Sequence, residues 1–515
     1  MSRTEPGGLR SSSYAALPAE FYSALAPTPV ADPRLIKWNS ALAAELQLGA
    51  EGLSDAALAA IFSGNQVIAG TRPLAMAYAG HQFGQFVPQL GDGRAILLGE
   101  ARDRSGRRRD VQLKGSGRTP YSRGGDGRAA LGPVLRECLV SEAMHAMGVA
   151  TTRTLAAVAT GESVFREGRL PGAVLTRVAA SHVRVGTFQY FAARGEDGAV
   201  RRLADYVIER HFPEVRSAAN PPLELLRSVV RRQASLIGAW MNVGFIHGVM
   251  NTDNMAVSGE TIDFGPCAFM DAYDPATVFS SIDHRGRYAY ANQPAAAQWN
   301  LARFAETLLP LIDPSAERAI DLATAAVNDF AAQFQDEWLA GMRRKLGLFT
   351  EEDGDGALIQ ALLDTMHRQQ ADFTLVFRRL CAAAESAVRD PAAGGSAPSE
   401  VSASDAMAAE AAVSGAFSDP LSYTAWSARW RERLAREPQP GSDHAAFMRL
   451  VNPAVIPRNH RIEEVIKAAV EQGDLAPFEE LSQALSRPFE ELPRFAGYTS
   501  PPKPEERVLQ TFCGT

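Results

Sequence analysis

Two side chains with oxygen ligands, Asn254 and Asp263, lie close together in the sequence and could hold a divalent metal ion, with Asp253 beside them as a further carboxylate. They belong to residues 247–265, where His-Gly-Val-Met-Asn-Thr-Asp-Asn is followed by a short turn and by Ile-Asp-Phe-Gly. In protein-kinase-like folds, a loop asparagine and the Asp of Asp-Phe-Gly both bind metal on ATP. Because Mg²⁺ prefers such hard oxygens and Mn²⁺ suits the same ligands, this stretch predicts a metal–nucleotide site.

One departure from the kinase pattern affects the chemistry. Kinases place an aspartate base five residues before the loop asparagine, and the residue there is Val249, which cannot accept a proton. Asp253 is the only nearby carboxylate and is the candidate proton acceptor, the alternative being a loop or helix-cap aspartate. The Ala-Pro-Glu motif of protein kinases is also absent after Asp263, which argues against ordinary protein-kinase substrate docking.

Further kinase-like parts appear upstream in the expected order. Val-Gln-Leu-Lys114 stands where kinases carry their strand-borne phosphate lysine. The helix predicted next, at 129–147, carries Glu137, which could pair with that lysine, and Glu142 as a second candidate. Residues 91–94, Gly-Asp-Gly-Arg, could cover phosphate, because glycine allows the backbone to approach a ligand closely.

Charge is distributed unevenly along the chain. The window 94–136 holds eleven basic and four acidic residues, so it carries +7 within a chain of net charge −7. This window is rich in glycine and contains one aromatic residue, Tyr121. A groove for single-stranded nucleic acid uses aromatic residues between its charges, so a compact polyphosphate is the better ligand.

Composition excludes several classes of protein. A net charge of −7 argues against a chain that coats nucleic acid or an anionic membrane. No run of 18 apolar residues occurs, and the N-terminus lacks the apolar core of a secretory signal. Four scattered cysteines are too few for a disulfide framework or a zinc site, so we expect a cytoplasmic protein.

Hydrophobic periodicity and turn residues predict strands first and helices afterwards. Met255 to Ile262 reads as a tight hairpin and 384–418 as a linker or mobile loop. The residues after 418 return to helical patterns. The other predicted strands are 95–100, 110–114, 155–159, 163–165 and 173–177, and the helices are 55–62, 129–147, 223–243, 298–311, 314–338 and 356–383.

These elements predict an α+β fold with the two lobes of a protein kinase, a strand-rich N-lobe and a helical C-lobe. At roughly 150 residues per domain, 515 residues suggest about three domain-sized units. The predicted divisions are an N-terminal extension (1–75), an N-lobe (76–178), a C-lobe with the catalytic loop and Asp-Phe-Gly (179–345), and a helical C-terminal region (346–515) that contains the stretch 384–418.

Three longer motifs resemble the selenoprotein O family, which has a pseudokinase fold and acts as protein adenylyltransferases. The resemblance covers nearly the whole chain. It rests on Ala-Gly-His-Gln-Phe-Gly-Gln-Phe-Val-Pro-Gln-Leu-Gly-Asp-Gly-Arg (79–94), Gln-Leu-Lys-Gly-Ser-Gly-Arg-Thr-Pro-Tyr-Ser-Arg-Gly-Gly-Asp-Gly-Arg (112–128), and the stretch 247–267.

The resemblance implies that ATP binds in a flipped orientation and that AMP passes to a Ser, Thr or Tyr hydroxyl of client proteins, with release of pyrophosphate. UTP could replace ATP. It implies Asp253 as the proton acceptor, Asn254 and Asp263 as metal ligands, and Glu137 as the residue that orients Lys114. The nucleotide-binding residues that it implies are Gly91, Gly93, Arg94, Lys114, Asp126, Gly127, Arg177, Arg184 and Asp263.

Two cysteines acquire a second interpretation from the resemblance. Cys267 follows Asp-Phe-Gly-Pro, and Cys513 lies where many family members carry selenocysteine or cysteine. A reversible disulfide between them would be a redox switch, the alternative being two unpaired thiols. We expect a monomer with no nucleic-acid or membrane partner. Two other functions remain open, a kinase-type phosphotransferase and a non-catalytic nucleotide-binding scaffold.

Overall fold

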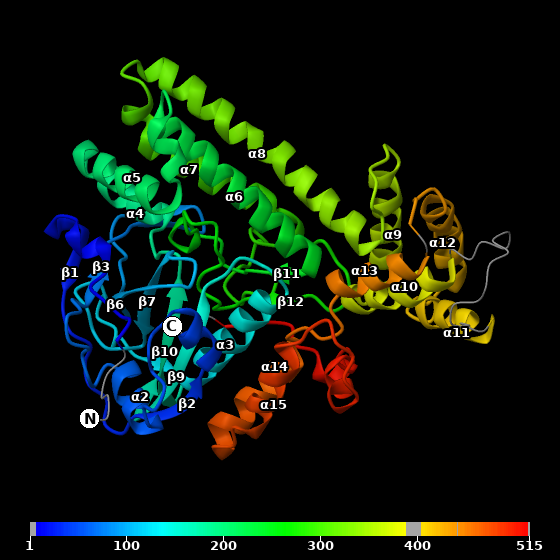
Figure 1. Cartoon of the computed structure of the whole chain (residues 1–515), viewed down its shortest axis with the longest axis horizontal. Helices are drawn as coiled ribbons and strands as arrows, with labels where there is room; N and C mark the ends of the chain where they lie inside the picture. The colour runs from blue at the N-terminus through cyan, green and yellow to red at the C-terminus, as the bar shows by residue number, and fades with distance from the viewer. Residues whose placement is uncertain (1–6, 388–402, 440, 513–515) are drawn as a thin grey trace.

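An eight-stranded antiparallel sheet forms one side of the molecule, drawn in blue to cyan in Figure 1. The computed structural model describes residues 7–387, 403–439 and 441–512. The strand order is β1-β3-β6-β7-β10-β9-β2, with β8 beside β10. The strands of this sheet are β1 (Tyr22–Ala24), β2 (Arg34–Trp38), β3 (Leu74–Met76), β6 (Ala95–Arg102), β7 (Arg108–Lys114), β8 (Ala129–Ala130), β9 (Arg153–Phe165) and β10 (Arg169–Ala179).

The central strands are buried on both faces, which explains their continuous apolar character. Along β10, Val174 and Val178 belong to the core on one face, together with residues of α1 (Ser40–Glu45) and α2 (Asp55–Phe62). Leu175 points to the opposite face and belongs to the main core, with α3 (Leu131–Ala146). This alternation is the two-residue period of a strand between two apolar layers.

The strands predicted at 95–100 and 110–114 are confirmed, and they form an antiparallel pair from Ala95 opposite Lys114 to Arg102 opposite Arg108. The helix at 55–62 is confirmed as well. The strands predicted separately at 155–159 and 163–165 are one strand, β9. Gly161 lies between the two predicted segments, and β10 pairs with β9 on both sides of it, with a register shift between them.

Helices of the middle of the chain form a second layer beside the sheet. In Figure 1, α6, α7 and α8 lie side by side in green along one edge of the molecule. The helices predicted at 223–243, 298–311 and 314–338 correspond to them and are longer than expected. The helices of this layer are α4 (Val185–Ala192), α5 (Asp197–His211), α6 (Pro221–Val243), α7 (Gln293–Ile312) and α8 (Ala316–Lys345).

Three sequence predictions are wrong in this part of the chain. The helix predicted at 356–383 is two helices, separated after Gln370, whose φ of 52° closes the first one. The segment predicted as a linker contains a helix at Ala403–Ser414, where alanine favours helix, and residues 388–402 lie outside the described residues. The expected hairpin at 255–262 does not form, because Ala256 pairs with Arg184 and Thr261 with Thr151.

The helices after residue 345 extend away from the sheet and then return to it (Figure 1). α14 and α15 pack on α3, where Arg136 and Glu463 form an ion pair and Gly132 lies against Ile466. The helix that carries Glu137 is therefore held from two sides. These helices are α9 (Asp355–Gln369), α10 (Phe373–Ala387), α11 (Ala403–Ser414), α12 (Pro420–Leu434), α13 (Gly441–Val451), α14 (Asn459–Lys467) and α15 (Ala476–Leu485).

Two short ribbons lie outside the large sheet. One is the hairpin of β4 (Gly80–Gln82) and β5 (Gln85–Val87), and the other pairs β11 (Phe245–Ile246) with β12 (Ala268–Phe269). None of the helices in the described part of the chain combines the length and the hydropathy that crossing a membrane requires.

One lysine is buried in the helical region without a carboxylate partner among the described residues. The Lys345 side chain lies over the rings of Phe377, 4.3 Å from the ring centre, and Phe373, at 5.3 Å. Burial lowers the pKa of Lys345 to about 7. Above that pH the unfolded chain holds a proton that the folded chain has lost, so folding stability rises with pH until the unfolded lysine titrates near 10.5.

We therefore expect Lys345→Met to raise Tm by several degrees at pH 6, because it removes the cost of burying an ammonium group. The advantage should shrink between pH 7 and pH 9, where the wild-type lysine becomes neutral. Thermal unfolding of both proteins across this range tests the expectation, with exposed Lys467→Met as the control. An advantage that is independent of pH would contradict it.

Candidate active site

A cavity of about 460 Å³ brings most of the predicted site residues together. Its volume lies within the range of small-molecule sites. Residues from the sheet and from the helical region both contribute to its wall. The predicted residues that line it are Gly93, Arg94, Lys114, Arg177, Arg184, Asp253, Asn254 and Asp263.

The carboxylate of Asp263 is the electrostatic centre of this cavity. Its Oδ1 accepts hydrogen bonds from Arg177 at 2.5 Å and from Lys114 at 3.3 Å, and its Oδ2 accepts one from Arg184 at 2.8 Å. Burial alone would disfavour the charged form. The three cations nevertheless hold the pKa of Asp263 well below its usual range.

Each cation comes from a different element. Lys114 ends β7, Arg177 lies on the neighbouring β10 opposite Gln112, and Arg184 caps the start of α4. Glu137 on α3 accepts a hydrogen bond from Lys114 at 2.5 Å, as predicted. The second candidate on α3, Glu142, instead accepts hydrogen bonds from the Arg153 guanidinium at 2.8 Å.

Asp263 also has an unusual backbone. Its φ of 64° lies in the left-handed region, which a non-glycine residue adopts at a cost of order 1 kcal/mol. Phe264, the next residue, is buried in the main core and holds the segment in place. The strain therefore occurs where the carboxylate is aimed at the three cations.

Asp253 lies beside this centre in a closely packed position. Arg184 donates a hydrogen bond to its backbone carbonyl at 2.7 Å, and burial raises the pKa of its carboxyl group to about 6. A side chain on Gly80 would place its Cβ 2.4 Å from Asp253 Oδ1. A Cβ on Gly186 would lie 2.1 Å from the Ala79 carbonyl oxygen and 3.3 Å from Asp253 Cα. Two glycines are thus required for the approach of β4 and α4 to this residue.

Asn254 is oriented by the residue that replaces the kinase base. Its Nδ2 donates to the Val249 carbonyl oxygen at 2.9 Å, which leaves Oδ1 as the available ligand atom. Val249 itself lines the cavity and offers no acceptor from its side chain. His247 stacks on Trp240 and is hydrogen-bonded to the Ile262 carbonyl at 2.9 Å, so it supports the loop from inside the core.

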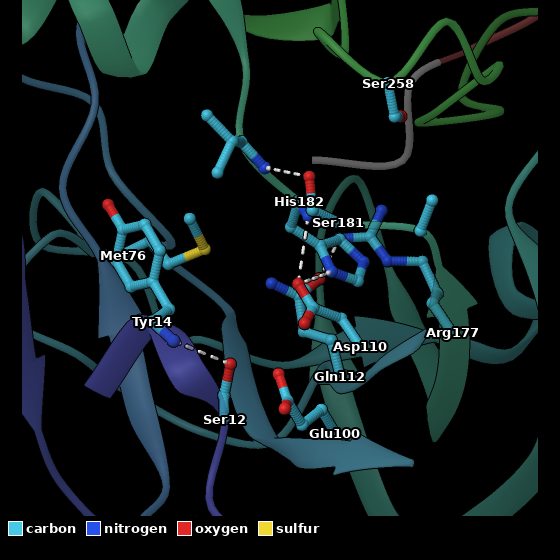
Figure 2. Close-up of polar contacts among 12 residues, drawn as sticks. Ser12, Tyr14, Met76, Glu100, Asp110, Gln112, Arg177, Ser181, His182 and Ser258 are labelled. Carbon is cyan, nitrogen blue, oxygen red and sulfur yellow. Dashed lines mark hydrogen bonds and ion pairs between the residues drawn. The ribbon is translucent and has the colours of Figure 1, made fainter. Parts of the chain in front are cut away.

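A second layer of buried polar groups lies behind the cavity. Figure 2 shows Asp110 facing His182 and Ser181, with Gln112 and Arg177 nearby. Asp110 accepts a hydrogen bond from the His182 backbone at 3.1 Å, and Gln112 accepts one from Arg177 at 2.5 Å. This layer ties the sheet to the segment that leads into Arg184.

Three predicted nucleotide-binding residues do not line the cavity. Gly91 adopts a φ of 72° next to the ring of Tyr121. Asp126 is exposed and forms an ion pair with Arg166 at 2.9 Å, which lowers its pKa. Gly127 lies beside the backbone of residue 117.

Sequence reasoning missed several residues of the cavity wall. The ring of Tyr78 packs against the Arg184 guanidinium, with its centre 4.6 Å from the guanidinium carbon. Asp92 accepts hydrogen bonds from the Met76 backbone at 3.0 Å and from Gln112 at 3.2 Å, and burial raises its pKa to about 6. Asp92 and Gln82 lie inside the motif at 79–94 that resembles the family, so this motif was the sequence signal that could have identified them. The other missed residues of the wall include Arg123 and Asn251.

Of the two cysteines of the predicted redox pair, one lies within the described residues. Cys267 is buried, and burial raises the pKa of its thiol to about 12. Cys513 lies outside the described residues. Thr511 lies beside the segment that contains Cys267, since it donates to the Pro266 carbonyl through Oγ1 at 2.5 Å and to Phe279 through its backbone N–H at 2.7 Å.

Comparisons with known proteins agree with the resemblance. A family model described as protein adenylyltransferase SelO matches residues 10–486. The chain is 62% identical to proteins named protein nucleotidyltransferase YdiU from Rhizobium rhizogenes and Rhizobium meliloti, over 98% of this chain and 96% and 98% of theirs. It is 60% identical to the protein of that name from Agrobacterium fabrum, over 98% of this chain and 99% of the other.

A phosphate that entered this cavity would compete with Asp263 for the three cations, which leads to a prediction about metal-free binding. We expect Asp263→Asn to bind pyrophosphate in EDTA at least about tenfold more tightly than wild type, a gain of about 1.4 kcal/mol. We also expect its ligand-free Tm to fall, because the cations lose their counter-charge. Calorimetric titration and thermal unfolding measure the two effects.

Asp321→Asn is the matched control, since it removes one carboxylate from an exposed position on α8. It should leave both quantities unchanged. Equal or weaker pyrophosphate binding by Asp263→Asn would show that the carboxylate does not restrain these cations.

Proposed function

Because the chain belongs to the SelO family of protein adenylyltransferases, we propose that it transfers AMP from ATP to a Ser, Thr or Tyr hydroxyl of client proteins and releases pyrophosphate. The observation that carries the proposal is the convergence of Lys114, Arg177 and Arg184 on one carboxylate in the cavity. A pyrophosphate leaving group bears several negative charges. Three fixed cations are the means by which such a site stabilises them.

The proposal assigns each charged residue a part in one displacement. The acceptor hydroxyl attacks the α-phosphorus, and its proton passes to the carboxylate of Asp253. As the new P–O bond forms, the bond from the α-phosphorus to the bridging oxygen breaks, and its electron pair leaves with pyrophosphate. Lys114, Arg177 and Arg184 bind that leaving group, and Glu137 keeps Lys114 in position.

The residues present fit a divalent cation. The Asn254 amide donates to Val249 and so presents its oxygen, and Asp263 supplies a carboxylate. No group of three or more His, Cys, Asp or Glu residues suited to a metal occurs in the described part of the chain. Two protein ligands with phosphate and water are a usual Mg²⁺ arrangement, and Mn²⁺ suits them too. When bound, the ion neutralises phosphate charge.

We assign the rest of the nucleotide to the glycine-rich side of the cavity. In the flipped orientation that the family implies, the triphosphate reaches inward to the three cations and the nucleoside lies toward Gly93 and Arg94, which line the cavity. A protein-kinase-like division of the chain into two lobes, one with the sheet and one with α4–α8, belongs to the same proposal. UTP is an alternative donor, because the phosphate contacts do not depend on the base.

Two other functions predict different products. A kinase-type phosphotransferase would transfer the γ-phosphoryl group, but Val249 stands where its base would be. A non-catalytic scaffold would bind the nucleotide and transfer nothing. The position of Asp253 in the cavity wall favours transfer, because an aspartate that only caps a loop does not need to face the ligand.

The paired use of α- and γ-labelled ATP distinguishes these functions. We expect label to pass to protein from α-³²P-ATP and not from γ-³²P-ATP. Asp263→Ala should abolish transfer, and Asp253→Asn should lower kcat by about 10²- to 10⁴-fold, the usual contribution of a general base. Initial rates on a client extract, measured by gel autoradiography, give both results.

Transfer of the γ-label would establish the phosphotransferase instead. If neither label moves while ATP still binds, the scaffold is the better description. Full-rate AMP transfer by Asp253→Asn would remove the base assignment but leave the adenylyltransferase activity in place. Val249→Ala serves as the control for changes to the loop that touch no acidic group.

The same proposal includes redox control by Cys267 and Cys513. Its support is the position of Thr511 in the C-terminal tail, whose hydroxyl donates to the carbonyl of Pro266, the neighbour of Cys267. Oxidation of the two thiols to a disulfide would need an oxidant such as oxidised glutathione, and it would fix this tail segment over the residues after Asp263. Burial keeps the Cys267 thiol protonated, so the reaction should be slow.

We expect oxidised glutathione to change the AMP-transfer rate of the wild type and to leave Cys267→Ala unaffected. The fully buried Cys381→Ala is the control, and it should respond as the wild type does. Equal sensitivity of the wild type and Cys267→Ala would exclude this pair. The remaining parts of the proposal are a cytoplasmic location and action as a monomer on client proteins, without a nucleic-acid or membrane partner.

A further inference from the structure

The small hairpin β4–β5 lies against the loop that carries Asp253. It is separate from the eight-stranded sheet, and Gly80, His81 and Gln82 pair with Val87, Phe86 and Gln85. Before it, Ala79 donates a backbone hydrogen bond to Gly186 of α4 at 2.9 Å. The hairpin therefore connects the sheet side of the cavity to the helical side.

Three consecutive hairpin residues contact three consecutive loop residues. The His81 backbone N–H donates to Thr252 Oγ1 at 2.7 Å, and the Phe83 backbone N–H donates to Asn251 Oδ1 at 3.0 Å. Between them, Gln82 Nε2 donates to Asp253 Oδ2 at 3.4 Å. The two backbone hydrogen bonds fix the position of the hairpin along the loop. This position brings the Gln82 side chain to the Asp253 carboxylate.

The loop side of this contact is fixed as well. Thr252 Oγ1 donates to Gln189 Oε1 at 2.6 Å, and the Tyr288 hydroxyl donates to Asn251 Oδ1 at 2.8 Å. On the hairpin, the ring of Phe83 packs on Tyr288, with 5.2 Å between ring centres. These contacts attach the hairpin without any contribution from the Gln82 side chain.

The carboxylate of Asp253 has few partners. Among the described residues, Gln82 is the only side chain that donates to it. The other oxygen, Oδ1, is buried without a hydrogen bond and faces Gly80. Within the described part of the chain, one long hydrogen bond from a side chain thus orients this group, and such bonds often shorten only when the substrate binds.

We propose that Gln82 is the positioning residue of the reaction, which holds the Asp253 carboxylate in the rotamer that receives the acceptor's proton. The inference rests on the proposed role of Asp253 as proton acceptor. Gln82 also lines the cavity, so its amide is present where the acceptor hydroxyl enters. Its neighbour across the hairpin, Gln85, is exposed and makes no such contact.

Replacement of Gln82 by methionine keeps the length of the side chain and removes the donor. We expect Gln82→Met to lower kcat for AMP transfer by about 10- to 100-fold, as the loss of a residue that orients a reacting group commonly does. KM for ATP and Tm should remain within error of the wild type. Gln82→Asn, which retains an amide on a shorter side chain, should recover part of the loss. Gln85→Met is the matched control and should be fully active.

A double-mutant cycle with Asp253→Asn separates positioning from a general structural effect. In that background, Gln82→Met should cost nothing further, because the carboxylate it positions is gone. Equal losses in both backgrounds would overturn the inference, as would full activity of Gln82→Met. Gln82→Ala repeats the test should the methionine variant fail to fold.

The outcomes also distinguish this inference from the proposed function. An unaltered rate of Asp253→Asn would remove the base on which the inference depends. A strong effect of Asp253→Asn with additive loss from Gln82→Met would retain the base and reject only Gln82.

Discussion

The balance between one carboxylate and three cations, two of them buried, is the constraint on which the rest of this structure depends. Arg177 and Arg184 are almost wholly buried, and a buried cation is strongly destabilising unless a counter-charge lies beside it. Asp263 provides that charge for both of them and for Lys114. The strand ends, the start of α4 and the loop after Ile262 must therefore meet at one point.

The groups around Asp263 and its three cations hold these elements in place. Glu137 shares Lys114 and Arg177 with Asp263, and α3 is held against the sheet by α14 and α15 from the far end of the chain. Behind them, Gln112 connects Arg177 to Asp92. These charged groups are paired with neighbours whose own positions are fixed, which is how a buried polar network stays ordered.

How much the sequence could predict depends on how far apart in the chain the interacting residues lie. Lys114, Asn254 and Asp263 were predictable, since each stands in a local motif on a recognisable element. Arg177 and Arg184 came from family resemblance alone, because an arginine on a strand or before a helix carries no local signal. Gln82 was missed because its partner lies 171 residues away in the sequence.

Errors in secondary structure had local causes of a different kind. The helix predicted at 356–383 is interrupted at Gln370, which has a left-handed backbone conformation. Neither glycine, the usual residue at such a helix end, nor proline stands at this position in the sequence. The segment at 403–414 is rich in alanine, which is common in linkers and is also the best helix former, so composition could not decide. Strand β9 continues through Gly161 because its partner strand does, which is a tertiary effect.

The enclosure of Asp253 by Gly80 and Gly186 has a consequence for the mutational tolerance of the protein. Every other amino acid adds a Cβ, and at both positions that atom would fall closer than 3 Å to an oxygen. No conservative replacement exists there, in contrast to an apolar core position, where one aliphatic residue can often substitute for another. Drift in the gene is thus restricted at two residues that carry no functional group, because a side chain at Gly80 would fill the space of the Asp253 carboxylate and one at Gly186 would fill the space of the Ala79 carbonyl.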